Sequence, residues 1–318
     1  MPIRIPDALP AASILEDENI FVMTERRAIS QDIRPLRLLL LNLMPTKITT
    51  ETQILRKLSN TPLQIEVELL RIASHEAQNV SEGHLEAFYT TFDQIKHQRF
   101  DGLIITGAPV ERLEFDDVDY WDELCEIMEW SRTHVHAVLH ICWGAQAGIF
   151  YHYGIKKREL QSKLFGVFSH EVLKPSSPWV RGFDDVFWAP HSRYTDVALE
   201  DIEDHPELET VAASPSAGAY LVKSRDSKNF FVFGHPEYDG DTLGREYQRD
   251  VEKGIDISLP ANYFPEDDVT GEPRVNWRAH AQLLYTNWIN YYVYQTTPYD
   301  IDEIGHERAG GQHGADAV

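Results

Sequence analysis

Short apolar runs alternate with longer amphipathic segments in the first half of the chain. Continuous apolar runs are typical of strands buried on both faces, and period-2 alternation is typical of strands with one exposed face. Four such segments predict strands, at 36–43, 63–72, 101–107 and 135–142. Segments between them predict helices at 49–58, capped by Thr49 or Thr50, at 118–130, and from Trp143 onward. This alternation predicts a parallel, doubly wound sheet with helices on both faces.

The pattern changes to short β-like pieces beyond Lys163. We expect them to be short antiparallel strands added to the parallel sheet, at 163–173, 183–194, 219–224 and 229–234, with a turn at 225–228 between the last two. Two further helices are predicted, at 242–253 and 277–294.

The organisation that follows is one catalytic domain rather than two. The middle of the chain contains no linker rich in Gly, Ser or Pro. We therefore expect a catalytic domain at 36–300, preceded by an arm at 1–35 that packs on it. Residues 301–318 lack an apolar period and predict a mobile tail. The first twenty residues contain no apolar core of the kind found in signal peptides.

One stretch has the length of a membrane span. Residues 134–155 contain no Asp, Glu, Lys or Arg. The stretch also contains four histidines and three glycines, which are unusual in a membrane-spanning helix. A strand, a tight turn and a buried helix account for the same length, and we expect this arrangement.

Composition narrows the classes of protein. With 42% hydrophobic and 25% charged residues the chain is globular, which excludes a disordered or collagen-like protein. Its 29 basic and 51 acidic side chains leave a net charge of −22, which disfavours binding to nucleic acid or to anionic membranes. Only two cysteines occur, at 125 and 142, which favours a reducing compartment over a secreted disulfide framework. We expect a cytoplasmic protein.

The most specific local feature is Cys142, where the predicted strand 135–142 meets a glycine-containing helix start. A cysteine at such a strand-to-helix elbow is held on a tight turn above the sheet, and the positive end of the helix favours its thiolate. The backbone N–H of Trp143 would be available to an oxyanion. Cys125, by contrast, falls on the apolar stripe of 118–130, which predicts packing in the core.

A thiolate nucleophile needs a base, and His235-Pro236-Glu237 follows the apolar strand at 229–234. In extended backbone, residues two apart share a face, so His235 and Glu237 would both point at the crevice, the carboxylate supporting the imidazole. The crevice of an open α/β sheet lies beyond the carboxyl ends of its strands, where Cys142 is also expected. If His235 were not the base, His191 and His140 would be the alternatives.

Metal binding is the rival interpretation. His134, His136, His140 and Cys142 occupy even positions of one predicted strand, but along a strand they would spread too far to close a tetrahedral site. The acidic run 111–129 lacks the glycine turn of a calcium loop and predicts a solvated face. Glu111, shortly after the strand at 101–107, is placed to face the crevice.

Motifs of other chemistries are absent. The chain has no GxGxxG or GxxxxGK[ST] phosphate loop and no Gly-x-Ser-x-Gly elbow. Of the chemistries considered, acyl transfer at a cysteine thiol is the one that remains.

Four motifs carry a resemblance to a known family. They are CWGAQAG at Cys142, PHSRY at 190–194, GHPEYD at 234–239, and TNWINYYVYQTTPYD, which ends at Asp300. With these motifs the sequence closely resembles the homoserine O-acyltransferases of methionine biosynthesis, over almost the whole chain. The resemblance implies a flavodoxin-like fold related to class I glutamine amidotransferases. It also implies a homodimer, with acyl-CoA as a substrate and no resident cofactor or metal.

The resemblance assigns roles to particular residues. It implies a triad of Cys142, His235 and Glu237, with the Trp143 amide and an amide near Gly107 or Ala108 at the oxyanion. It further implies substrate contacts from Lys163, Ser192 and Arg249. Relatives that use succinyl-CoA resemble one another in carrying glycine where this chain has Glu111, so Glu111, with Ser192, is implicated in the choice of acyl donor.

The expected activity is transfer of an acetyl group from acetyl-CoA to L-homoserine through an acylated Cys142. The first alternative is the corresponding succinyltransferase. A glutamine amidotransferase-like hydrolase would use the same triad, and a non-catalytic binding module of the same fold would leave Cys142 inert.

Overall fold

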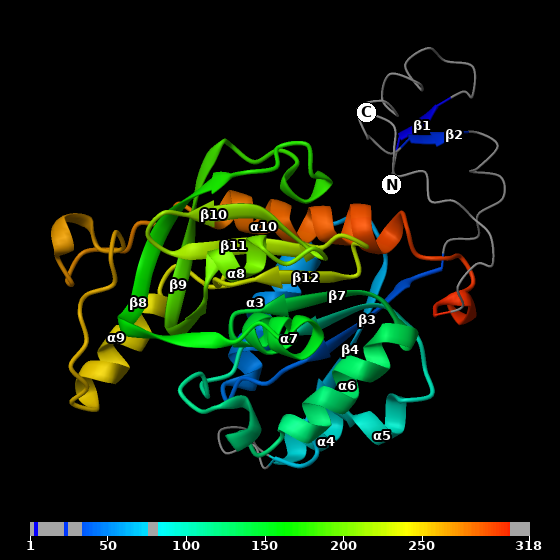
Figure 1. Ribbon diagram of the computed structural model, residues 1–318, viewed down its shortest axis with the longest axis horizontal. Coiled ribbons are helices and arrows are strands. Elements are labelled where there is room, and N and C mark those ends of the chain that lie inside the picture. Colours follow the sequence, from blue (N-terminus) through cyan, green and yellow to red (C-terminus); the bar gives the residue numbers. More distant parts are fainter. Residues whose placement is uncertain (1–2, 6–21, 25–33, 76–81, 306–318) are drawn as a thin grey trace.

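The centre of the molecule is a mixed ten-stranded sheet. A computed structural model describes residues 3–5, 22–24, 34–75 and 82–305, and the sheet lies within them (Figure 1). Its strands run in the spatial order β5-β4-β3-β6-β7-β12-β11-β10-β8-β9. Their bounds are β3 (Leu36–Leu41), β4 (Ile65–Arg71), β5 (Tyr89–Thr91), β6 (Phe100–Ile105), β7 (Val135–Ile141), β8 (Lys157–Val172), β9 (Val186–Val197), β10 (Leu208–Ser214), β11 (Gly218–Ser224) and β12 (Asn229–Val232).

Six neighbouring strands, from β5 to β12, are parallel to one another. Within them the order β4-β3-β6-β7-β12 is the flavodoxin-like order, which confirms the predicted fold class. Because these strands are parallel, their carboxyl ends share one edge of the sheet. The connections reverse direction between β3 and β6, and this is the point where open α/β sheets form their ligand crevice.

The antiparallel extension was predicted in kind but not in detail. β11, β10, β8 and β9 pair antiparallel, as expected. β8 has 16 residues and β9 has 12, so these strands are not short. The expectation that 229–234 is an antiparallel addition was wrong, since β12 pairs parallel with β7 and antiparallel only with β11. The strand β10 was not predicted at all.

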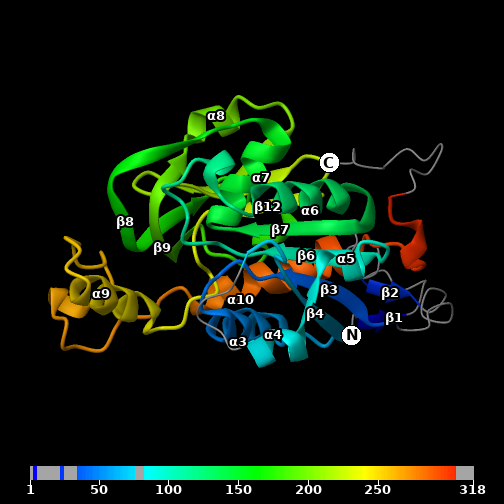
Figure 2. The same ribbon diagram turned by 90° about the horizontal axis from the view of Figure 1, so that it is seen from below.

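Helices cover both faces of the parallel half. α3 and α10 lie on one side, and α6 and α7 on the other (Figure 2). The helices are α3 (Lys47–Leu58), α4 (Glu82–Phe88), α5 (Phe92–Ile95), α6 (Trp121–His134), α7 (Trp143–Tyr153), α8 (Leu199–Glu203), α9 (Thr242–Glu252) and α10 (Arg278–Asn287), with short helices η1 (Phe115–Asp117), η2 (Pro178–Val180), η3 (Pro265–Asp267), η4 (Trp288–Tyr294) and η5 (Ile301–Glu303). Most match the predicted segments. α3 begins earlier than expected, because Thr46 and not Thr49 or Thr50 precedes it, and the predicted helix 277–294 ends in the π-helical turn η4.

The alternation of side chains along β3 shows why the sheet is buried on both faces. Leu38 and Leu40 pack in one core cluster with Ile54 of α3 and Trp288 of η4. Leu39 and Leu41 point to the other face and pack in a second cluster that includes Leu124, Met128 and Trp143. Consecutive leucines therefore enter different cores, as the continuous apolar run predicts.

The ends of the chain are described only in part. β1 (Ile3–Ile5) and β2 (Val22–Thr24) form a small parallel sheet, and the rest of 1–33 lies outside the described residues. The packing of the arm 1–35 thus stays a prediction. The same holds for the tail at 301–318, of which 306–318 lies outside the described residues.

The uncharged stretch 134–155 is the end of α6, then β7 and α7, as a strand, a turn and a buried helix. None of the helices in the described part of the chain has the length and apolarity needed to cross a membrane.

Candidate active site

Cys142 lies at the elbow between β7 and α7. Its φ is +52° and its ψ is −115°, a backbone conformation that non-glycine residues rarely adopt and that costs conformational energy. Two sets of hydrogen bonds hold it there. The Cys142 N–H donates to the carbonyl of Val232 at 2.7 Å, and its own carbonyl accepts from Ala145 at 3.0 Å and Gln146 at 3.2 Å. The cysteine is thereby fixed at the carboxyl edge of the sheet.

Two glycines permit the close packing around this elbow. A Cβ on Gly144 would lie 2.6 Å from the carbonyl oxygen of Thr106, so only glycine lets α7 begin this close to the end of β6. A Cβ on Gly107 would lie 3.3 Å from Cβ of Cys142 and 3.7 Å from Cε1 of His235. The backbone at Gly107 therefore lines the space beside both side chains. Trp143, as the first residue of α7, has an N–H with no acceptor inside the helix.

His235 and Glu237 form a buried pair beyond the end of β12. Nδ1 of His235 lies 2.7 Å from Oε1 of Glu237, and both side chains are buried. The extended segment predicted here was wrong. The chain turns at 236–237, where the Tyr238 N–H donates to the His235 carbonyl at 3.2 Å, and this turn folds the carboxylate onto the imidazole. The His235 N–H donates to the Pro190 carbonyl at 2.9 Å, which ties the turn to β9.

Cys142 lies on the other side of the His235 imidazole, and the backbone at Gly107 borders both side chains. Burial by itself would lower the pKa of His235. The negative charges of Cys142 and Glu237, together with the hydrogen bond to Glu237, outweigh burial and raise this pKa well above the ordinary histidine range. The side chains of Cys142, His235 and Glu237 thus lie in a row in the folded protein, with His235 in the middle. The arrangement can hold a thiolate next to an imidazolium.

Tyr238 joins this pair to a second group of polar residues. Its ring stacks on His235 with centroids 4.2 Å apart, and its hydroxyl donates to Oε1 of Glu246 at 2.7 Å. Oε2 of Glu246 accepts from the hydroxyl of Ser192 at 2.6 Å. Ser192, which the family resemblance implicated, is therefore linked to the His235 ring through two side chains. Sequence reasoning missed both Tyr238 and Glu246.

Lys163 and Arg249 converge on one carboxylate. Nζ of Lys163 lies 3.1 Å from Oδ2 of Asp250, and the Arg249 guanidinium lies 2.7 Å from Oδ1. Burial opposes ionisation of Asp250, but the hydrogen bonds from Arg249 and Lys163 hold its pKa below the usual range. The Lys163 side chain is only 9% exposed, whereas that of Arg249 is 52% exposed and has free donors. Arg249 can therefore still reach a small anion.

Glu246, Arg249 and Asp250 lie on α9, which stands at one end of the molecule beside β8 and β9 (Figure 1). Their spacing of three and four residues places Glu246 on the same helix face as Arg249 and Asp250. This spacing was the one signal in the sequence from which Glu246 and Asp250 could have been found.

The loop that contains Glu111 lies near Tyr194, on the side of the site that also holds Lys163. Nζ of Lys157 donates to the Glu111 and Leu113 carbonyls, each at 2.5 Å, and the Arg112 guanidinium lies 3.8 Å from the centre of the Tyr194 ring. The Tyr194 ring lies 5.6 Å from Nζ of Lys163. The charge of Glu111 is close enough to Tyr194 to contribute to the raised pKa of that tyrosine, behind burial and Asp250. Glu111 thus lies on the side of the crevice that also holds Lys163.

The four residues considered above as metal ligands do not all lie on one strand. His134 is the last residue of α6, Cys142 lies past the end of β7, and Nε2 of His140 lies 3.2 Å from Oδ1 of Asn229. No group of three or more His, Cys, Asp or Glu suited to a metal ion occurs within the described ranges. His191, one alternative base, is occupied by His170 at 3.0 Å and by Arg193. Cys125 is half-buried against the core, and both cysteines are free.

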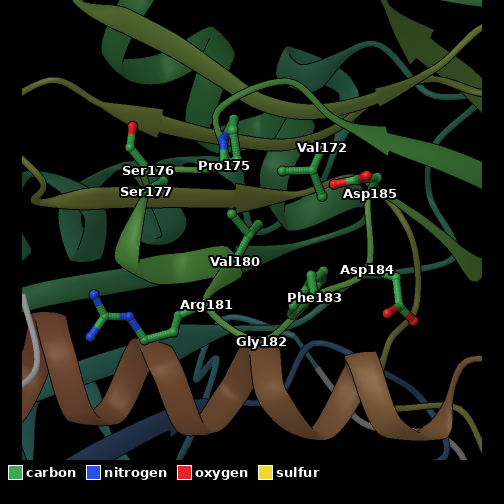
Figure 3. A pocket seen from close by; sticks show the side chains of 10 residues that line it. All are labelled: Val172, Pro175, Ser176, Ser177, Val180, Arg181, Gly182, Phe183, Asp184 and Asp185. Atoms are coloured by element: carbon green, nitrogen blue, oxygen red, sulfur yellow. The ribbon is translucent and has the colours of Figure 1, made fainter. Parts of the chain in front are cut away.

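A cavity of about 300 Å³ opens at the connection between β8 and β9, between Val172 and Asp185 (Figure 3). The side chains of Arg181 and Asp184 lie on opposite sides of it in Figure 3. None of the residues predicted for the site lines this cavity.

The fold defines the structural class. The flavodoxin-like sheet of this chain is similar to the fold of class I glutamine amidotransferases. Solved structures of this class resemble the chain in fold alone. A glutamine amidotransferase from Thermotoga maritima is 12% identical with a TM-score of 0.53, over 80% of this chain and 97% of the other. One from Methylobacillus flagellatus is 13% identical with a TM-score of 0.50, over 81% and 95%.

Sequence comparison goes further than the fold. The family model described as homoserine O-succinyltransferase matches residues 2–299, and the chain belongs to this family. Relatives named homoserine O-acetyltransferase are 60% identical in Petrotoga mobilis, over 96% of this chain and 98% of the relative, and 57% identical in Acetivibrio thermocellus, over 96% and 100%. A third, from Brevibacillus brevis, is 58% identical over 95% and 99%. The protein is accordingly an acyltransferase, and the resemblance noted from the motifs is confirmed.

Proposed function

We propose that the protein transfers the acetyl group of acetyl-CoA to the side-chain hydroxyl of L-homoserine, giving O-acetyl-L-homoserine for methionine biosynthesis, through an acylated Cys142. The observation that carries the proposal is the placement of Cys142 beside His235, whose other side is hydrogen-bonded to Glu237, at the crevice edge. The names of relatives that are 57–60% identical over nearly the full chain support the choice of substrates.

In the first half-reaction the Cys142 thiolate attacks the thioester carbonyl carbon of acetyl-CoA. The carbonyl π electrons move to oxygen, and the oxyanion is stabilised by the Trp143 N–H and by an amide at Gly107 or Ala108. When the oxyanion collapses, the carbon–sulfur bond to CoA breaks. The CoA thiolate takes the proton of the His235 imidazolium, and the acetyl group stays on Cys142.

The second half-reaction uses the neutral imidazole that remains. His235 removes the proton of the homoserine hydroxyl while the oxygen attacks the acetyl carbon on Cys142. Collapse of this second oxyanion breaks the bond to Cys142 and restores the thiolate beside the imidazolium. Glu237 holds the imidazole in the tautomer and orientation that both steps need. The exposed donors of Arg249 would pair with the carboxylate of homoserine, with Lys163 supporting them through Asp250.

The choice of acetyl over succinyl rests on Glu111. A succinyl group ends in a second carboxylate, which would approach Glu111 on the Tyr194 side of the crevice. Two like charges about 4 Å apart at an effective dielectric constant near 20 repel by about 4 kcal/mol, and a third of that repulsion would disfavour succinyl-CoA about tenfold. An acetyl group has no such charge. Ser192, held by Glu246, is the second residue we place at the acyl group.

Two measurements test the proposal: release of the CoA thiol and hydrolysis of glutamine. Release of the CoA thiol is followed with acetyl-CoA and with succinyl-CoA, each with and without homoserine. We expect homoserine-dependent release that is fastest with acetyl-CoA. Preference for succinyl-CoA would make the protein the succinyltransferase that its family model is named for. Hydrolysis of glutamine, with no thiol release from either donor, would instead place it with the glutamine amidotransferases whose fold it shares.

A further inference from the structure

A small basic notch lies at the carboxyl ends of β3 and β4, outside the residues assigned above. Lys47, Arg71 and His75 supply its charged side chains, and Asn42, Leu43 and Tyr120 line the remainder together with Ile72. Lys47 begins α3, Arg71 ends β4, and His75 follows β4 by four residues. Three basic side chains at one point are unusual in a chain of net charge −22.

Within the described residues, not every cation of the notch has an anionic partner. The Lys47 side chain is buried, and its Nζ donates to the Asn42 carbonyl at 2.6 Å. Burial lowers the pKa of Lys47 to about 8, Glu51 opposes this shift, and the neighbouring charge of Arg71 adds to it. The Arg71 side chain makes no hydrogen bond or ion pair with any residue in the described ranges. A half-buried guanidinium that faces another cation, and that has no anionic partner among the described residues, favours an external anion.

The carboxylates around the notch have partners other than Arg71, and one of them, Asp119, pairs with His75 of the notch itself. Asp119 lies 2.7 Å from Nδ1 of His75, which leaves the Nε2 side of that ring for another partner. Glu123 accepts from the N–H groups of Ala73 and Ser74 and from the Ser74 hydroxyl. Glu51 accepts from the Tyr89 hydroxyl at 2.5 Å. None of these three acids forms a hydrogen bond or ion pair with the Arg71 side chain.

The notch is connected to the reaction centre by a short path of contacts. The Leu43 N–H donates to Oγ1 of Thr106 at 2.8 Å, and this hydroxyl donates to the Gly107 carbonyl at 3.1 Å. Gly107 packs beside Cys142. Strands β4, β3, β6 and β7 are consecutive neighbours, and at about 4.8 Å per strand the ends of β4 and β7 are about 14 Å apart.

This span is close to the reach of the pantetheine arm of CoA. About thirteen bonds separate the sulfur of CoA from its nearest phosphorus, which is the length of roughly four extended residues, or about 14 Å. Lys163, Ser192 and Arg249, on β8, β9 and α9, lie on the other side of Cys142 in the strand order, and the loop of Glu111 contacts Tyr194 of β9 through Arg112. The acyl chain and the leaving group of a thioester point away from its carbonyl in different directions. We therefore place CoA on the β3 and β4 side.

We propose that the basic notch of Lys47, Arg71 and His75 binds phosphate groups of the acyl-CoA donor, with Arg71 as the principal contact. The proposal rests on the proposed function, because it names the place where the donor of that reaction is held. The same site would accept inorganic phosphate or pyrophosphate more weakly, since the recognised chemistry is a phosphate ester.

The test compares two donors that differ only in the part that the notch would hold. For Arg71→Gln we expect KM for acetyl-CoA to rise about tenfold, with kcat within twofold of wild type. S-Acetylpantetheine, which lacks the nucleotide and its phosphates, should be used equally well by both proteins. The matched control is Arg132→Gln, an exposed arginine near the end of α6, at the opposite edge of the sheet. Pyrophosphate should inhibit wild type competitively against acetyl-CoA and should inhibit Arg71→Gln less.

Other outcomes would overturn the assignment. Equal losses with acetyl-CoA and S-acetylpantetheine would mean that Arg71 supports the fold or the chemistry and does not read phosphate. An unchanged KM for acetyl-CoA would exclude the notch as the donor site. Failure of the proposed function shows separately, as wild type that releases no thiol with either donor. Titration of CoA and pantetheine into the Cys142→Ser protein, with and without Arg71→Gln, measures the contact without turnover. We expect the Cys142→Ser protein to bind CoA more tightly than pantetheine. The protein that carries both Cys142→Ser and Arg71→Gln should lose this preference.

Discussion

The ring of Tyr238 lies face to face with the imidazole of His235, with 4.2 Å between centroids and 16° between planes, while its hydroxyl donates to Glu246 at 2.7 Å. One side chain thus contacts the proposed base and the residue that holds Ser192. The stack restricts rotation of the imidazole, and the hydroxyl positions the carboxylate of α9. Tyr238 is accordingly a positioning residue that joins the two parts of the site.

Tyr238→Phe separates these two contacts, because it keeps the ring and removes the hydroxyl. A hydrogen bond to a charged group contributes about 1.5–3 kcal/mol, so we expect KM for homoserine to rise about tenfold or more. Acylation of Cys142 by acetyl-CoA, measured by rapid quench and mass spectrometry, should stay within twofold of wild type. Tyr238→Leu removes the stack as well and should slow acylation too. Equal acylation rates in the two variants would show that the stack does not position His235.

Cys142→Ser should abolish transfer and leave the fold intact, since a serine hydroxyl is too weakly acidic to replace a thiolate. Wild type incubated with acetyl-CoA alone should gain one acetyl group, located on Cys142 by peptide mass spectrometry. Cys125→Ser is the matched control and should transfer normally. Burial and nearby acids raise the pKa of Cys125 to about 11, so iodoacetamide at neutral pH should label Cys142 first. An acetyl adduct elsewhere would reject the acyl-Cys142 scheme.

His235→Asn should reduce kcat by about 10² to 10⁴, the usual contribution of a general base, and Glu237→Gln should reduce it by a similar or smaller factor. The measurement is the steady-state rate from pH 6 to 9. Near-normal rates for His235→Asn across this range would remove His235 from the mechanism. Neither His191 nor His140 could then be adopted without moving the partners that now hold them.

The raised pKa of His235 also predicts how stability depends on pH. The protonated imidazole is favoured in the folded state, so its contribution is fully present below the ordinary histidine pKa of about 6.5. The contribution is lost as pH rises through the higher pKa of the folded state. Wild type should therefore lose free energy of unfolding relative to His235→Asn as pH rises from about 6.5. Denaturant unfolding at a series of pH values measures the difference.

The same series on Cys142→Ser provides the internal check. The negative charge of Cys142 is the largest contribution that raises the pKa of His235, so its removal should reduce the loss of stability and move it to lower pH. A difference between wild type and His235→Asn that does not vary with pH would contradict the raised pKa.

Glu111→Gly should increase kcat/KM for succinyl-CoA relative to acetyl-CoA by about tenfold, because it removes the charge that repels the succinyl carboxylate. Glu111→Gln is the informative companion, since it keeps the size of the side chain and removes the charge. If only the glycine variant accepts succinyl-CoA, space rather than charge selects the donor. An unchanged ratio in both variants would show that Glu111 is not the selector.

Much of the parallel half could be predicted from sequence, because its signals are local. The leucines of 36–41 divide between two cores as a continuous apolar run requires, and Cys142 stands where an apolar strand meets a glycine-containing helix. The pairing direction of β12 could not be predicted in this way. It depends on which strand lies beside it, and the neighbour β7 is about ninety residues away in the chain.

The residues of the site also divide into those with a local signal in the sequence and those without one. His235 and Glu237 could be selected from their position after a strand, yet the turn that joins them has no marker beyond Pro236. Glu246 and Asp250 were not recognised, because an acidic residue on an amphipathic helix has the same pattern whether it faces solvent or holds Ser192 and Lys163. Only the packing of α9 beside β8 and β9 makes the distinction.

The proposed nucleophile and base stand at the ends of β7 and β12, which belong to the parallel half, whereas Lys163, Ser192 and Arg249 stand on β8, β9 and α9 outside it. In the proposed mechanism, bond making and acceptor recognition are therefore assigned to separately built parts of the fold. Substitutions in the outer part can change which hydroxyl compound is accepted without altering the strained elbow at Cys142. A sheet of this design can acquire new acceptors while its reactive thiol stays in place.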